Sequence, residues 1–167
     1  MTPAELLTDS LERVRESVGA VLDGLSPDDL TRRPSRDANP IGWLVWHLTR
    51  VQDDHVAHVA GTEQVWTADG FAGRFDLPYA TDTHGYGQTS EEVGQFRADA
   101  DLLSAYHDAV HARTLEYLAG LTPDDLDRVV DKRWDPPVTL GARLVSVVND
   151  DTQHVGQAAY IRGLLGR

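Results

Sequence analysis

Cysteine is absent from the 167-residue sequence, and this absence excludes several kinds of chemistry at once. Without cysteine there is no disulfide framework, no thiolate metal site and no cysteine nucleophile. Any bound metal must therefore be held by His, Asp or Glu side chains. Any thiol that takes part in a reaction must arrive with a substrate or a cosubstrate.

Basic residues are scarce as well. Lys and Arg together number 15 against 27 Asp and Glu, which leaves a formal net charge of −12. Binding to nucleic-acid phosphates or to anionic membrane surfaces needs clustered positive charge, so this balance argues against both. The sequence also lacks an apolar run of the roughly 18–20 residues that span a bilayer, and its first residues do not resemble a signal peptide. We therefore expect a cytoplasmic protein whose partners include neither nucleic acid nor membrane.

What the sequence does contain is helical patterning. Apolar residues recur at alternating spacings of four and three, which is typical of one buried helix face. These spacings predict four helices, over residues 3–24, 41–60, 89–119 and 139–165. Asn39 is expected to cap the second helix, and the third is expected to bend near residues 98–100. The polar residues 31–39 and 127–138 are interpreted as loops.

Two further features define the expected architecture. Residues 61–88 are rich in glycine and follow no sustained period, so they predict a long connection, which is usually functional or mobile. Residues 22–30 match residues 118–126 closely, which indicates either a helix-loop-helix pseudo-repeat or shared capping chemistry. Both interpretations predict a single all-α domain over 1–167. Its fold is an up-down-down-up four-helix bundle with a long crossover between the second and third helices.

A polar interruption in the helix over 139–165 is the strongest functional signal. Asp150 and His154 are four residues apart, so both side chains project from one side of an otherwise apolar helical face. Burying an unpaired carboxylate is costly, and a metal ion relieves that cost. Asp151 is an alternative to Asp150 as the acidic member of this pair. Gln157, one turn beyond His154, is placed to position a bound water or a substrate.

His47 offers a third donor from the helix over 41–60, where it lies in an apolar and aromatic stretch. Metal sites in the cores of bundles are built from side chains on facing helices. Together with Asp150 and His154, His47 would supply three protein ligands and leave one position open, which is typical of a catalytic metal site. A metal there would lower the pKa of a bound water or thiol. Each of these residues taken alone also fits an ordinary hydrogen-bonded core side chain.

A second histidine pair competes for this role. His107 and His111 are four residues apart, and the intervening Asp108 makes the segment similar to the His-Glu-x-x-His helix of metalloproteases. The pair lies one residue off the apolar stripe, so we expect it on a solvated flank. The remaining histidines are interpreted as surface or loop residues: His55, His58 and His84.

The Trp-His-Leu segment at 46–48 and the Asp150-x-x-x-His154-x-x-Gln157 pattern resemble the DinB/YfiT-like superfamily of metalloenzymes, across nearly the whole chain in helix order. Residues 134–141 and 153–160 are similar to its actinobacterial, mycothiol-dependent branch, which includes proteins like the N-terminal part of maleylpyruvate isomerase. Most members of the superfamily have His at the position of Asp150, whereas the isomerase has a carboxylate there.

The resemblance implies a DinB-like bundle with a divalent metal held by His47, Asp150 and His154, and with Gln157 as a catalytic residue. Zinc is the expected metal, with nickel or iron as alternatives. It also implies that a low-molecular-weight thiol, mycothiol or one like it, is bound as the nucleophilic thiolate and attacks an electrophile. The function expected on this basis is that of a metal-dependent thiol S-transferase.

Two other functions stay open on the sequence alone. One is a non-catalytic bundle that binds a small molecule or a partner, and the other is a metal hydrolase that uses activated water. Arg50, Arg143 and Arg162 are candidates to pair with a substrate carboxylate, and the sequence does not rank them. A homodimer formed through helix faces is compatible with the sequence, because symmetric pairs are the commonest assembly.

Overall fold

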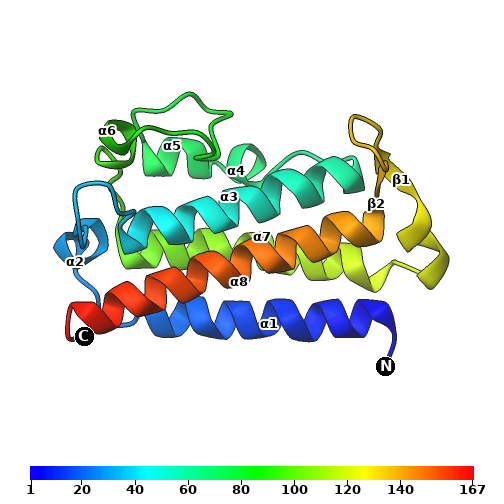
Figure 1. Ribbon diagram of the computed structural model, residues 1–167, viewed down its shortest axis with the longest axis horizontal. Helices are drawn as coiled ribbons and strands as arrows, with labels where there is room; N and C mark the ends of the chain where they lie inside the picture. Colours follow the sequence, from blue (N-terminus) through cyan, green and yellow to red (C-terminus); the bar gives the residue numbers. More distant parts are fainter.

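Four long helices lie side by side in the computed structural model, which describes residues 1–167 (Figure 1). They are α1 (Pro3–Leu22), α3 (Ile41–Ala60), α7 (Ala100–Ala119) and α8 (Leu140–Leu164). Figure 1 shows α1 and α8 running in one direction and α3 and α7 in the other. α7 and α8 each pack against both α1 and α3. The predicted up-down-down-up bundle is therefore confirmed, with its long crossover between α3 and α7.

Shorter elements connect the long helices. The helical ones are α2 (Pro27–Thr31), α4 (Val65–Ala68), α5 (Phe71–Phe75), α6 (Ser90–Val93) and the 3₁₀ helix η1 (Pro123–Asp127). The strands β1 (Val129–Asp131) and β2 (Val138–Thr139) form a two-stranded antiparallel hairpin just before α8. The interpretation of residues 127–138 as a loop was therefore incomplete. None of the helices combines the length and the hydropathy that a membrane-spanning helix needs.

The matching segments at 22–30 and 118–126 adopt similar local structures, with a short α-helix in the first and a 3₁₀ helix in the second. Ser26 begins α2 and Thr122 begins η1, and each forms a reciprocal capping box with an aspartate three residues later, Asp29 or Asp125. Each segment thus ends one long helix and starts a single short turn through its Ser/Thr-Pro-Asp-Asp chemistry. α1 ends at Leu22, two residues before the predicted boundary.

The start of α3 differs from the prediction. Pro40, not Asn39, is the N-cap residue, and no side chain caps this end. Pro40 is extended, with φ −78° and ψ 161°, and its carbonyl accepts the first helical hydrogen bond from Leu44. The helix therefore begins one residue later than a cap at Asn39 would require. Its other end follows the prediction, because Gly61 adopts φ +70° and stops the helix there.

The third predicted helix is interrupted, not bent. α6 ends at Val93 after a single turn, and α7 begins only at Ala100. Thr89 starts α6 through a capping box, and the Asp99 side chain starts α7 by accepting a hydrogen bond from the Leu102 backbone N–H at 2.7 Å. Two separate capping residues therefore produce two helices where the periodicity alone predicted one.

The crossover over 61–88 contains α4 and α5, which the sequence pattern did not predict. Figure 1 shows both short helices lying over α3. The buried carboxylate of Asp53 accepts hydrogen bonds from the backbone N–H groups of Val65 at 2.9 Å and Trp66 at 2.8 Å. This side chain satisfies the start of α4 from 12 residues away, so no local capping signal precedes the helix.

The predicted solvated flank of α7 was wrong. His107 and His111 are buried, with only 1% and 4% of their surface exposed. The reason is that α7 packs against α1 on one side, against α3 on another, and against α4 and α5 of the crossover. A residue next to the apolar stripe is therefore buried, while the exposed face of α7 is limited to positions such as Asp101, Asp108 and Ala112.

We expect this burial to make the protein sensitive to mild acid. Burial, with a smaller contribution from His111, lowers the pKa of His107 from 6.5 to about 4. Between these values the unfolded chain takes up a proton that the folded protein does not, so the free energy of unfolding decreases as the pH falls from 6.5 to 4. The expected loss is about 3 kcal/mol. Urea unfolding at pH 7, 5.5 and 4.5 measures it, and His107→Gln should flatten this dependence. An unchanged dependence in the variant would contradict the assignment.

Candidate metal centre

Three residues from two facing helices converge at one point. His47 comes from α3, and Asp150 and His154 come from α8, the pair of helices that packs most extensively in the bundle. One donor atom from each residue lies within 4.8 Å of the other two. Zinc bound by such donors at 2.0–2.2 Å would require them to be about 3.4 Å apart in a tetrahedron. Small side-chain adjustments are therefore enough to bring all three onto one ion.

His47 is held in one orientation by its surroundings. Its Nδ1 atom lies 2.5 Å from the backbone carbonyl oxygen of His84, which fixes the proton on Nδ1 and leaves Nε2 as the available donor. The imidazole stacks on the indole of Trp43, with ring centroids 4.7 Å apart and planes 13° apart. Trp43 is in turn held by a 2.8 Å hydrogen bond from its Nε1 to the Gln88 side chain. Burial is the main cause that lowers the pKa of His47, so this imidazole is neutral, the form that binds metals.

The crossover can approach His47 this closely only because residue 85 is glycine. A Cβ atom at Gly85 would lie 2.7 Å from Nδ1 of His47 and 2.9 Å from the Trp43 ring. Gly85 also has φ +99°, a backbone conformation that other residues rarely adopt. The crossover segment therefore contributes a carbonyl group and a tight backbone contact to the centre. From the sequence His84 was expected to be a surface or loop residue, and no local pattern predicts this role.

Asp150 and His154 interact with each other on one turn of α8. Nδ1 of His154 lies 2.8 Å from the backbone oxygen of Asp150 and 3.2 Å from its Oδ2. Burial alone would lower the pKa of His154, but the hydrogen bonds and negative charge of Asp150 outweigh it and raise this pKa. Burial alone would likewise raise the pKa of Asp150, but His154 outweighs it and lowers this pKa. Oδ2 of Asp150 is buried without a well-aligned hydrogen bond. A cation bound to this oxygen would offset the cost of burying its negative charge.

The neighbouring Asp151 does not join this cluster. Its side chain is completely buried in the bundle, and neither carboxyl oxygen has a hydrogen-bond partner. Burial, with a smaller contribution from Asp150, raises the pKa of Asp151 well above its ordinary value, which favours the neutral form of this side chain. Asp150 and Asp151 were both candidate ligands from the sequence, and of the two Asp150 has the geometry of a ligand.

Gln157 is exposed on α8 and does not line the pocket described next, so its catalytic role stays a prediction.

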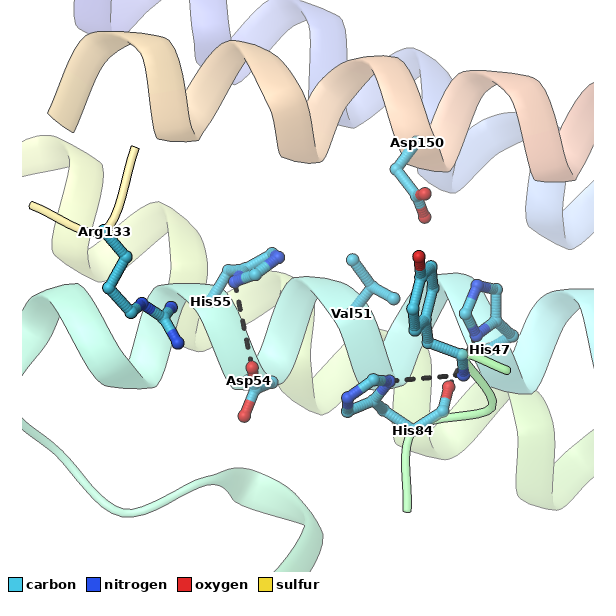
Figure 2. Close-up of a pocket in the computed structure, with 8 residues that line it drawn as sticks. His47, Val51, Asp54, His55, His84, Arg133 and Asp150 are labelled. Atoms are coloured by element: carbon cyan, nitrogen blue, oxygen red, sulfur yellow. Dashed lines mark hydrogen bonds and ion pairs between the residues drawn. The ribbon is translucent and has the colours of Figure 1, made fainter. Parts of the chain in front are cut away.

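A pocket of about 450 Å³ opens beside the cluster (Figure 2). Figure 2 shows Asp150 pointing from α8 toward α3, with His47 and His84 on the opposite side. The pocket is lined by His47, Val51, Asp54, His55, His84, Tyr86, Arg133 and Asp150. Most of these side chains are polar, so the pocket suits a hydrophilic ligand. The cluster is therefore accessible to a small molecule and not sealed inside the core.

Three of the lining residues that were not expected from the sequence lie outside the long helices: His84, Tyr86 and Arg133. All three belong to segments without helical periodicity, so no apolar stripe indicates which way their side chains point. One local signal does mark Tyr86, which lies between Gly85 and Gly87. Both glycines have positive φ, and the Tyr86 side chain is 87% exposed at the pocket.

A four-helix bundle of this topology, with a His/Asp/His cluster between its second and fourth long helices, defines a DinB-like protein. Comparison with known families makes the assignment specific, because residues 6–166 match the family model described as mycothiol S-transferase. The chain belongs to this family.

Comparison with solved structures supports the same fold. The chain is similar to a protein from Enterococcus faecalis whose crystal structure is described only as that of a conserved protein of a locus. The two share 31% sequence identity and a TM-score of 0.93, over 100% of this chain and 99% of the other. No curated protein matches the sequence significantly.

Proposed function

We propose that this protein is a divalent-metal-dependent S-transferase, which activates a low-molecular-weight thiol of the mycothiol type for attack on an electrophile. The observation that carries the proposal is the convergence of His47, Asp150 and His154 at the wall of an open, polar pocket. Membership of the mycothiol S-transferase family supports the choice of thiol.

The donor set fits a divalent metal, with zinc as the first choice and nickel or iron as alternatives. Two imidazole nitrogens and one carboxylate oxygen are ligands that zinc and its neighbours accept. Three protein ligands would leave one position open to the pocket. A metal bound there supplies a Lewis acid that keeps a bound thiol in its thiolate form at neutral pH. The chain has no cysteine, so the sulfur nucleophile has to come from the cosubstrate.

The residues around the cluster have separate parts in this reaction. The His84 carbonyl oxygen and the Trp43 ring hold His47 in place, so that its Nε2 atom would bind the metal without reorganisation. The polar pocket wall accepts the hydrophilic body of the thiol. The thiol proton leaves to solvent and the sulfur forms a C–S bond with the electrophile, while a leaving group departs with its electron pair or, in an addition, the adjacent carbon takes up a proton.

Metal analysis with a thiol-transfer assay tests this function. Protein purified without a nickel column is expected to hold close to one equivalent of a divalent metal and to transfer mycothiol to a chromogenic electrophile such as chlorodinitrobenzene. His154→Ala is expected to lose both the metal and the transfer. His58→Ala is the matched control, because His58 is an exposed histidine on α3 away from the pocket.

Two results would contradict the proposal. Equal, near-zero metal in the wild type and in His154→Ala, with thermal stability that a chelator does not change, would indicate a non-catalytic bundle. Metal-dependent turnover of an ester or amide without any thiol would instead indicate a hydrolase that uses activated water.

A further inference from the structure

The pocket continues well beyond the metal cluster. His47, Val51 and His55 follow one another along one face of α3 and line the pocket in that order. Eight residues of helix span about 12 Å, so the pocket can hold more than the reacting sulfur. Figure 2 shows Arg133 at the far end of this row, with His55 and Asp54 between it and His47. Arg133 comes from the turn of the β1–β2 hairpin.

Arg133 is held rigidly although it is exposed. Its Nε donates to Oδ1 of Asp131 at 3.0 Å and its Nη2 to Oδ2 at 2.8 Å. The buried Asp131 carboxylate also accepts a hydrogen bond from Arg143 at 3.2 Å. Two guanidinium groups thus share one carboxylate, which leaves a surplus positive charge in a protein of net charge −12. Nη1 of Arg133 has no partner, and the side chain is 86% exposed, so it can donate to a ligand.

The other candidate arginines are engaged inside the protein. Arg50 is 1% exposed and donates to the Thr83 carbonyl and the Gln64 side chain. Arg162 donates to backbone carbonyls of the loop after α1 and of its last turn. Arg143 is bound to Asp131 and does not line the pocket. Arg133, which the sequence analysis did not consider, is therefore the guanidinium that the pocket presents to a ligand.

Asp54 sets a limit on the charge of that ligand. It lines the same pocket, where its Oδ1 accepts a hydrogen bond from Gln64 at 2.8 Å and its Oδ2 lies 3.8 Å from Nδ1 of His55. This carboxylate would repel a ligand with several negative charges. A ligand with a single anionic group next to Arg133 therefore fits this end of the pocket best.

We propose that Arg133, positioned by Asp131, binds a carboxylate on the electrophilic substrate. Guanidinium groups bind carboxylates through two parallel hydrogen bonds, and the free edge of Arg133 is pre-organised for this contact. The inference rests on the proposed S-transfer and names its substrate class, which is an electrophile with one carboxylate about 10 Å from the carbon that sulfur attacks.

A matched pair of electrophiles tests the proposal. 6-Maleimidohexanoate and its primary amide differ only in the terminal group, and both react by addition: a C–S bond forms and the adjacent carbon takes a proton from solvent. With mycothiol as the thiol, we expect kcat/KM to favour the acid over the amide about tenfold, as one charge-assisted contact would. Arg133→Gln should bring this ratio close to one, and Arg133→Lys should give an intermediate ratio. Arg36→Gln, at an exposed arginine outside the pocket, should leave the ratio unchanged.

A binding measurement separates this inference from the proposed function. The unreactive 6-succinimidohexanoate is titrated by ligand-observed NMR into the wild type and into the His154→Ala protein without metal. We expect Arg133→Gln to weaken binding about tenfold in both backgrounds, even if no S-transfer is ever observed. Binding that disappears with the metal and ignores Arg133 would show that the carboxylate binds the metal and would overturn the proposal. Tighter binding of the corresponding amine would assign this end of the pocket to Asp54 and would overturn it equally.

Discussion

Asp150→Asn is expected to abolish stoichiometric metal binding, whereas Asp151→Asn is expected to leave it intact. The first change removes the negative oxygen donor beside His47 and His154. The second replaces a fully buried carboxyl group, whose pKa is raised by burial, by an amide of the same shape outside the cluster. Loss of a supporting residue around a metal site typically costs 10–100-fold in affinity, and a direct ligand should cost at least about 100-fold.

Competition against a chromogenic chelator measures this affinity for both variants and the wild type, and circular dichroism checks that both variants are folded. The two residues are adjacent and of the same type, so the comparison tests which of the two positions supplies the ligand. A reversed outcome, with metal lost in Asp151→Asn and kept in Asp150→Asn, would assign the ligand to the other aspartate. Retention in both variants would remove the carboxylate from the centre altogether.

Gly85→Ala is expected to weaken metal binding about 10–100-fold although residue 85 carries no donor. The new methyl group would lie 2.7 Å from Nδ1 of His47, so either the crossover or the imidazole has to move. Movement of either breaks the hydrogen bond to the His84 carbonyl that orients the ring. The positive φ of Gly85 adds backbone strain of about 1–3 kcal/mol.

Gly87→Ala separates these two effects. Gly87 also has positive φ, +78°, but a Cβ atom there would meet nothing within 4 Å. In thermal unfolding this control should therefore lose only the stability that the backbone strain costs, and it should keep its metal affinity. If Gly85→Ala and Gly87→Ala bind metal equally well, the contact between the crossover and His47 does not support the centre.

The long helices could be predicted because their information is local. The alternating three-and-four spacing in α1 and the Gly61 stop of α3 depend only on residues close in sequence. The contact between the Asp150 and His154 side chains is equally local, because a helix places residues four apart on one side. The sequence could therefore indicate two polar donors on one helix and a third on another, and the structure brings these three together.

The features that the sequence analysis missed depend on contacts between distant segments. The Asp53 side chain on α3 accepts hydrogen bonds from the first backbone N–H groups of α4. No residue next to α4 in the sequence provides a cap that would predict this helix. His107 is buried on α7, a helix that packs against α1, α3 and the crossover. Arg133 lines the pocket from the turn of the hairpin, which packs against α8. Neither periodicity nor capping chemistry carries information about such partners.

By itself the sequence determined an acidic all-α bundle without cysteine, and it placed imidazole and carboxylate groups on two of the four helices. Helix formation, helix ends and side-chain spacing follow from neighbours within about one turn. Only the tertiary structure decided that Asp150 and not Asp151 faces His47, that the His84 carbonyl orients this histidine, and that Arg133 lines the far end of the pocket. These outcomes depend on how the helices are rotated against one another and on where the crossover and hairpin dock, which only the packing of the whole chain sets.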